Sequence, residues 1–248
     1  MKLFRAELHI HTVLSPCAGI EMIPPLIVQE AISAGINLIA ITDHNTSYNA
    51  KSVIEAAKGS GLFVMPGMEL QTEEEVHSLC LFDTLDQLNE LQKIVDNKLP
   101  DMKNNIEYLG EQFVVDHLGE FIRREERLLI TSVNLSIDKA FEIVSNLGGL
   151  IIPAHVNREA YGIISHLGFL PPNLNFDALE VSRHLTIQEC LERFPQIKGY
   201  NLIQSGDVHF LDDFLGANYF NIEKPTIKEI KKALHKIDNR SYYINKSS

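Results

Sequence analysis

Short apolar runs alternate with amphipathic stretches along the whole chain. The runs have the length of buried strands and cover residues 4–10, 38–42, 62–65, 76–82, 150–153, 178–181, 202–204 and 217–222. Helices are predicted between them, at residues 24–34, 50–57, 84–98 and 136–147 and in the stretches capped by Thr186 and Thr226. Strands that alternate with helices predict an α/β protein with a parallel sheet. This many short units in 248 residues favours a small barrel, in which the chemistry lies at the carboxyl ends of the strands.

Residues 100–135 do not follow this alternation, because they are polar and charged without a strong period. Within them, residues 112–116 and 121–124 flank a His-Leu-Gly-Glu turn and predict a hairpin. We interpret the stretch as an insertion that serves as a flap or as an oligomer contact. The sequence has no internal repeat, low-complexity tract or linker, so residues 1–248 are expected to form one domain.

The composition narrows the classes of partner. A formal net charge of −11 argues against a nucleic-acid coat protein and against adhesion to anionic membranes, although bound cations would still admit a nucleotide substrate. No apolar run of about 18 residues and no signal-peptide pattern is present, so no membrane association is expected. Cys17, Cys80 and Cys190 are too few and too irregularly spaced for a disulfide framework, which favours a cytoplasmic protein.

The apolar runs repeatedly end on residues that can bind metal. His9 and His11 lie two apart in the first strand, so their side chains point the same way, as two ligands of one ion would. Alone, this pair also fits two histidines hydrogen-bonded in a core. The later strand ends repeat the pattern, however, and the side chains expected to meet on one rim of the barrel are His11, Asp43, His44, Glu69, His155, Asp207 and His209.

The order of these pieces is more specific than any one of them. His9-x-His11, Asp43-His44, Glu69 followed by His77, Pro153-Ala154-His155 and Gly206-Asp207-x-His209 together resemble the four-part signature of the PHP (polymerase and histidinol phosphatase) superfamily. The stand-alone bacterial PHP-domain phosphoesterases are the most similar group. The resemblance implies a distorted (β/α)7 barrel of the PHP type, with a short insertion around residues 100–135 and two to three divalent transition-metal ions on its rim.

The resemblance also implies a ligand set. The first metal would be held by His9, His11, Glu69 and Asp207, the second by Glu69, His77 and His155, and the third by His44, His209 and Cys17. Asp43 is expected to orient a neighbouring imidazole instead of binding metal. Relatives often place His or Asp at position 17. A thiolate there would favour zinc or iron over manganese, and the alternative is that Cys17 is only a small loop residue beside a weak third site.

Clustered divalent cations suit the cleavage of phosphate esters, because they acidify water and neutralise phosphate oxygens. The resemblance implies attack by a hydroxide that bridges the first two metals, with Glu69, Asp207 and His209 as the catalytic residues among the ligands. Arg158, Arg183 and His184 follow strand ends and are predicted to bind the phosphate. The alternative for each arginine is a surface ion pair with a nearby carboxylate.

The sequence therefore predicts a metal-dependent phosphoric ester hydrolase that acts on a small phosphorylated metabolite or nucleotide. The alternatives are a histidinol-phosphate phosphatase, an exonuclease-like activity on short oligonucleotides, and a metal-binding regulatory protein without turnover. An amidohydrolase is a further alternative, but such enzymes usually bridge their metals with a lysine, and here Glu69 takes that role. Long nucleic acid is not expected as a partner, because aromatic-plus-basic stretches are absent, and a homo-oligomer is left open.

Overall fold

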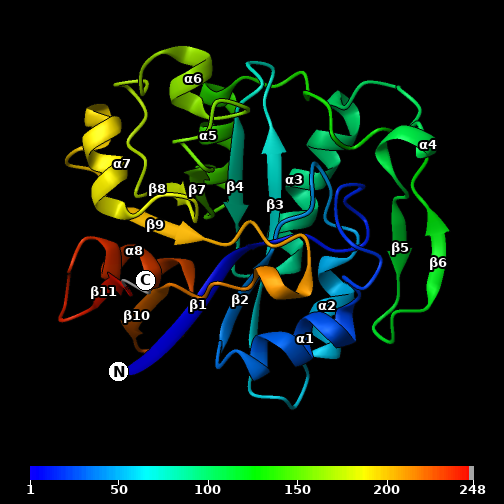
Figure 1. Cartoon of the computed structure of the whole chain (residues 1–248), viewed down its shortest axis with the longest axis horizontal. Coiled ribbons are helices and arrows are strands. Elements are labelled where there is room, and N and C mark those ends of the chain that lie inside the picture. Colours follow the sequence, from blue (N-terminus) through cyan, green and yellow to red (C-terminus); the bar gives the residue numbers. More distant parts are fainter. Residues whose placement is uncertain (246–248) are drawn as a thin grey trace.

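The computed structural model describes residues 1–245 and has at its centre a strongly curled seven-stranded sheet, seen in Figure 1. The strand order is β11-β10-β1-β2-β3-β4-β7. Their bounds are β1 Lys2–Ile10, β2 Leu38–Ile41, β3 Phe63–Gln71, β4 His77–Leu81, β7 Leu150–Pro153, β10 Asn218–Ile222 and β11 Ser241–Ile244.

A separate parallel pair, β8 (Leu179–Ser182) and β9 (Leu202–Ser205), lies between β7 at one edge of the curled sheet and β1. On one side Val156, just after β7, donates its backbone N–H to the carbonyl of Glu180 in β8. On the other side Val208, just after β9, exchanges backbone hydrogen bonds with His9 and His11 of β1 and its following loop. These bonds close the sheet into the distorted barrel that the sequence predicts.

The expectation of a parallel sheet is wrong for β4 and β10. β4 runs antiparallel to both β3 and β7, and β10 runs antiparallel to β1. The connection from β3 to β4 is a tight turn in which Glu75 adopts a positive φ of 60°, and so short a connection can only join antiparallel strands. Because of this reversal, His77 at the start of β4 lies at the same rim as side chains at the ends of the parallel strands.

The helices begin where the sequence places their caps. Thr84 and Thr186 form reciprocal capping boxes, and the Ser136 hydroxyl accepts a hydrogen bond from the backbone of Lys139. The helices are α1 Pro24–Ser33, α2 Ala50–Ala56, α3 Leu85–Lys98, α5 Ile137–Asn146, α6 Ile163–Leu167, α7 Ile187–Arg193 and α8 Ile227–Leu234. In the described residues, no helix combines the length and apolarity needed to cross a bilayer.

Apolar side chains fill both faces of the curled sheet, because neighbouring strand residues point to opposite faces. In β2, Leu38 and Ala40 join one cluster, which α8 covers with Ile230. Ile39 and Ile41 join the other cluster, which is shared with α1, α2, α3 and α5. The sheet is thus buried on both faces and forms a rigid frame for the loops at its rim.

Residues 100–135 form the predicted insertion. They contain a short helix, α4 (Ile106–Leu109), and an antiparallel hairpin of β5 (Phe113–Val115) and β6 (Phe121–Arg124). The hairpin lies at one edge of the molecule, on the right in Figure 1. It packs against the loop that follows β1, because the Phe113 N–H donates to the carbonyl of Val13. Its role as a flap or an oligomer contact stays a prediction.

Candidate metal centre

The structure brings the predicted ligands together at the rim of the barrel. His9 and His11 come from the end of β1, His44 from the loop after β2, and Glu69 from the end of β3. The remaining ligands follow at the start of β4 and just after β7 and β9, and they are His77, His155, Asp207 and His209. His155 and Asp207 have positive φ angles of 31° and 51°, so the chain turns sharply where each strand ends.

Glu69 lies at the centre of this group and is 1% exposed. Its Oε1 lies 2.9 Å from Nδ1 of His77 and 3.2 Å from Nε2 of His155. Its Oε2 lies 2.9 Å from Nδ1 of His44 and 3.3 Å from Nε2 of His11. The two oxygens of one carboxylate thus face different sets of imidazoles, which is the arrangement of a carboxylate shared between two cations.

The spacing of the donor atoms fits metal ligands. Metal bonds of about 2.0–2.2 Å to nitrogen or oxygen place neighbouring donor atoms roughly 3–3.5 Å apart. Nε2 of His9 lies 3.1 Å from Nε2 of His11 and 3.2 Å from Oδ1 of Asp207. Four buried atoms in the group make no hydrogen bond: Nδ1 of His44, Nδ1 of His155, Oε2 of Glu69 and Oδ1 of Asp207. Unpaired buried donors and acceptors at ligand spacing are explained by cations between them.

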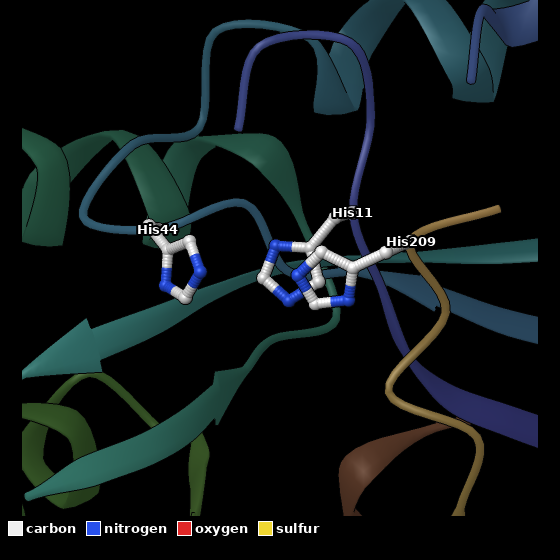
Figure 2. A group of neighbouring side chains, drawn as sticks. All are labelled: His11, His44 and His209. Carbon is white, nitrogen blue, oxygen red and sulfur yellow. The ribbon is translucent and has the colours of Figure 1, made fainter. Parts of the chain in front are cut away.

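A second cluster of imidazoles lies nearer the surface. Figure 2 shows His11, His44 and His209 side by side, each from a different segment of the chain. The rings of His11 and His209 stack with centroids 4.2 Å apart. Cys17 lies at the edge of this cluster, exposed to solvent, with its Sγ 3.1 Å from Nε2 of His209. Cys17 thus lies within reach of this cluster, and its role as a third-site ligand stays a prediction.

Nearby carboxylates and burial have opposite effects on the pKa values of the histidines in the cluster. Burial opposes protonation of His11 and His44, but their contacts with carboxylates outweigh it and raise the pKa of each imidazole to about 9. Burial lowers the pKa of His77 to about 4 and that of His209 to about 3. The last two imidazoles are thus neutral at pH 7, the state in which a ring nitrogen binds metal. Without cations, His11 and His44 hold protons instead.

Two of the ligand histidines are oriented by hydrogen bonds on the side away from the centre. Nδ1 of His9 donates to both oxygens of Glu180, at 3.1 Å each. Nδ1 of His11 donates to the hydroxyl of Ser15, at 2.9 Å, and that hydroxyl donates to Asp43, at 2.7 Å. The buried carboxylate of Asp43 accepts from Thr12 and Ser15 and from no ligand side chain, so it acts on the imidazole of His11 through Ser15, consistent with the predicted role.

The sequence interpretation missed Glu180, Gln71 and Glu7 as partners of the centre. Gln71 accepts a hydrogen bond from Nε2 of His77, which directs the opposite ring nitrogen toward Glu69. Glu7 accepts from the backbone N–H of Gly206, Leu215 and Gly216, which fixes the loop that carries Asp207 and His209. Glu7 and Glu180 could have been noticed as single carboxylates inside otherwise apolar buried strands.

The predicted phosphate-binding residues lie beside the centre. Arg158 is half-buried, and its guanidinium lies 2.6 Å from Oδ2 of Asp207. Arg183 forms an ion pair with Asp213, which is the alternative that the sequence left open for this arginine. The neighbouring His184 is exposed. All three line a recess of about 280 Å³ that reaches Asp207 and His209. The structure therefore places two guanidinium groups next to the centre, and phosphate binding by Arg158, Arg183 and His184 stays a prediction.

Comparison with known proteins agrees with this site. The family profile of the PHP domain matches residues 7–168, which include the ligands from His9 to His155. This chain belongs to the PHP domain family. Among PHP relatives, the DNA polymerase III PolC-type of Staphylococcus haemolyticus is 28% identical over 211 residues, which are 74% of this chain and 15% of the polymerase. An error-prone DNA polymerase of Nocardia farcinica is 40% identical over 65 residues, which are 26% of this chain and 6% of that protein.

Solved structures share the fold. The lesion-specific endonuclease PfuEndoQ from Pyrococcus furiosus matches with a TM-score of 0.75 and 21% identity, over 97% of this chain and 58% of that chain. A protein from Bifidobacterium adolescentis, described as a metal-dependent phosphoesterase, matches with a TM-score of 0.58 and 18% identity, over 89% of both chains. The chain is thus a PHP-domain protein with the PHP fold, and its buried ligand cluster has the composition of a multi-metal site.

Proposed function

We propose that this PHP protein hydrolyses the phosphate ester of a small metabolite or nucleotide, with two to three divalent transition-metal ions as cofactors and with residues 1–248 acting as a single domain. The observation that supports it is the convergence of buried imidazoles on both oxygens of Glu69, at the spacing of metal ligands. A cytoplasmic location stays a prediction from the cysteine pattern.

The ligand residues would form three cation sites at this centre. His9, His11, Glu69 and Asp207 would hold the first cation, Glu69, His77 and His155 the second, and His44, His209 and Cys17 the third. Bound cations supply an acidified water and neutralise phosphate oxygens. Glu180, Asp43 through Ser15, and Gln71 hold the imidazoles in the tautomers that present a free nitrogen to the centre.

Two further features concern residues at the edge of the centre, Arg158 beside the first cation site and Cys17 beside the third. Arg158 reaches one oxygen of Asp207 while the other faces the imidazoles, so its guanidinium can contact a phosphate held at the same cation. Cys17 adds a thiol to a set of imidazoles, and such a mixture favours zinc or iron at the third position over manganese. The first two positions combine imidazole and carboxylate, which suits manganese, iron or zinc.

The direct test is a panel of phosphate esters measured with each metal. Histidinol phosphate, nucleoside monophosphates and bisphosphates, and a generic aryl phosphate would be assayed after reconstitution with manganese, iron, zinc or magnesium. Release of inorganic phosphate that depends on a transition metal supports the proposal. A fully metallated protein that hydrolyses none of them would support a regulatory protein without turnover.

A second candidate is the cleavage of a phosphodiester, as in a short oligonucleotide. Two recesses, of about 210 and 280 Å³, meet at Cys17, Arg158, Asp207 and His209. A diester has a substituent on each side of its phosphorus, and recesses on both sides of the centre could receive them. The structural similarity to the endonuclease PfuEndoQ extends over nearly the whole of this chain and supports testing phosphodiesters. Bis(p-nitrophenyl) phosphate and short oligonucleotides belong in the same panel, and preference for them over monoesters would favour it.

A further inference from the structure

Tyr161 forms one wall of the recess that contains the ligand cluster. This recess, about 210 Å³ in volume, is lined by His44, Glu69, His77 and His155 on the side of the centre. Tyr161 lies in the loop between β7 and α6, six residues after His155, and 40% of its surface is exposed. Ile130 and Gln71 line the same recess. A large aromatic side chain is thus open to whatever enters beside the metal ligands.

One ring contact and two backbone hydrogen bonds hold Tyr161 in place, and its ring also lies parallel to that of His166, with centroids 6.3 Å apart. The ring of Tyr161 stacks on the ring of His77, with centroids 4.3 Å apart and planes at 8°. Its backbone carbonyl accepts the N–H of His77 at 3.0 Å, and its own N–H donates to Nε2 of His166 at 3.0 Å. The position of the ring is therefore fixed relative to a metal ligand, although the residue lies in a loop.

The backbone at Tyr161 is in an unfavourable conformation. Its φ is 61°, in the left-handed region that bulky residues rarely adopt. The next residue must be glycine, because a Cβ on Gly162 would lie against the carbonyl oxygen of Arg158. Strained residues of this kind occur preferentially at ligand-binding sites, where the surrounding structure holds them in place.

We propose that Tyr161, with Ile130 and Gln71, forms a subsite for a planar aromatic group of the substrate, such as a nucleobase or an aryl or imidazole ring. The aromatic ring and Ile130 offer apolar contact to the ring of the ester. The Gln71 amide is buried and already bonded to His77 and Ser132, and its second N–H is left to face the recess. The subsite rests on the proposed function, because the phosphate would lie at the adjoining centre. It selects among phosphate esters for those that carry a ring.

The test compares substrates with and without a ring in Tyr161 variants. Kinetics would be measured for an aryl phosphate, a nucleoside monophosphate and glycerol phosphate with the wild type, Tyr161→Phe and Tyr161→Leu. Loss of one stacking contact corresponds to roughly 5–150-fold. We expect Tyr161→Leu to lower kcat/KM on the order of 10-fold for the two ring-bearing esters, mainly through KM, and to leave glycerol phosphate within about 2-fold. Tyr161→Phe should retain the wild-type preference.

The controls separate the subsite from a purely structural role. If Tyr161 only supports His77, Tyr161→Leu lowers metal content and slows all three esters equally, which would overturn the proposal. Tyr108 lies outside the recess and is 83% exposed. The control variant Tyr108→Leu should therefore leave kcat/KM for all three esters and the metal content unchanged. If Tyr161→Leu does not fold, Tyr161→Asn tolerates the same φ and removes the ring.

A binding measurement keeps the subsite testable even if no ester is hydrolysed. Saturation-transfer NMR on the metallated wild type should show contact to the base protons of a nucleoside monophosphate, and Tyr161→Leu should weaken it. No transfer to the base in the wild type would overturn the subsite. Absence of hydrolysis together with transfer to the base would contradict the proposed reaction and leave the subsite standing.

Discussion

Replacement of Glu180 by glutamine tests whether an outer carboxylate sets the state of His9. Glu180 is 1% exposed and serves two donors, Nδ1–H of His9 at 3.1 Å and the backbone N–H of His155 at 2.9 Å. Glutamine keeps the size of the side chain but has a single acceptor oxygen, so its NH2 group must face one of these donors. With its oxygen in the place of Oε2, glutamine keeps both donors but turns its NH2 toward Nδ1–H of His9, which disfavours the tautomer that binds metal through Nε2. With the amide reversed, the N–H of His155 loses its partner.

Both outcomes weaken the centre. Loss of an outer-shell partner typically lowers metal affinity about 10–100-fold, and a buried donor left without a partner lowers the free energy of unfolding by about 1–3 kcal/mol. We expect Glu180→Gln to lose affinity for the first metal in this range, measured by competition with a chromogenic chelator, and to lose activity in parallel at limiting metal.

The matched control is Glu229→Gln, which alters a carboxylate that is 5% exposed on α8. Glu229 pairs with Arg240 and accepts the N–H of Glu223, without contact to the ligands. This variant should lose stability and keep its metal affinity. A folded Glu180→Gln protein that binds metal as tightly as the wild type would refute the reasoning about the tautomer of His9.

Three further predictions concern the ligands themselves. Glu69→Gln removes the charge that the first and second metal sites would share. Elemental analysis of this variant should show the loss of at least one metal, and turnover should be slower by roughly 100-fold or more. Normal metal content and a normal rate would exclude Glu69 as the bridging residue. Cys17→Ala should weaken metal binding at the third site only, while Cys17→His should retain it. In the wild type, removing metal with a chelator should speed alkylation of the Cys17 thiol, measured by mass-spectrometric labelling. Identical metal binding by the two variants would remove Cys17 from the site. Protonated His11 and His44, with pKa values of about 9 against an ordinary 6.5, stabilise the metal-free protein below pH 6.5, and this contribution is lost as the pH rises through 9. Because metal must displace these protons, the rise in Tm on adding manganese should grow between pH 6.5 and 9 in thermal unfolding scans, and a flat or falling profile would count against it.

The central strands, and the set of residues that meets at the rim, could be predicted from sequence, because burial in a strand and a polar residue at its end both depend on local residue type. Ser241–Ile244 was missed as β11, since a four-residue strand with alternating partial exposure gives a weak signal. The antiparallel direction of β4 was also missed, although the few residues between Gln71 and His77 leave no room for a crossover helix.

The partners of the ligands could not be predicted in the same way. Ser15 lies between Asp43 and His11 only because two loops from different strands meet. Glu180 contacts His9 over 171 residues of sequence, and this contact depends on how the β8–β9 pair is placed between β7 and β1. Local patterns report which side chains can bind metal, whereas their orientation is decided by the closure of the barrel.

The central claim is that the converging imidazoles and carboxylates form a multi-metal centre for the hydrolysis of phosphate esters. The most direct measurement is elemental analysis of protein purified without chelator and then titrated with manganese, iron or zinc, with phosphate release from an aryl phosphate followed at each step. We predict about two to three transition-metal ions per chain at saturation, with activity rising as the sites fill. Less than about half an equivalent bound after reconstitution, or full occupancy with no hydrolysis of any ester in the panel, would contradict this account.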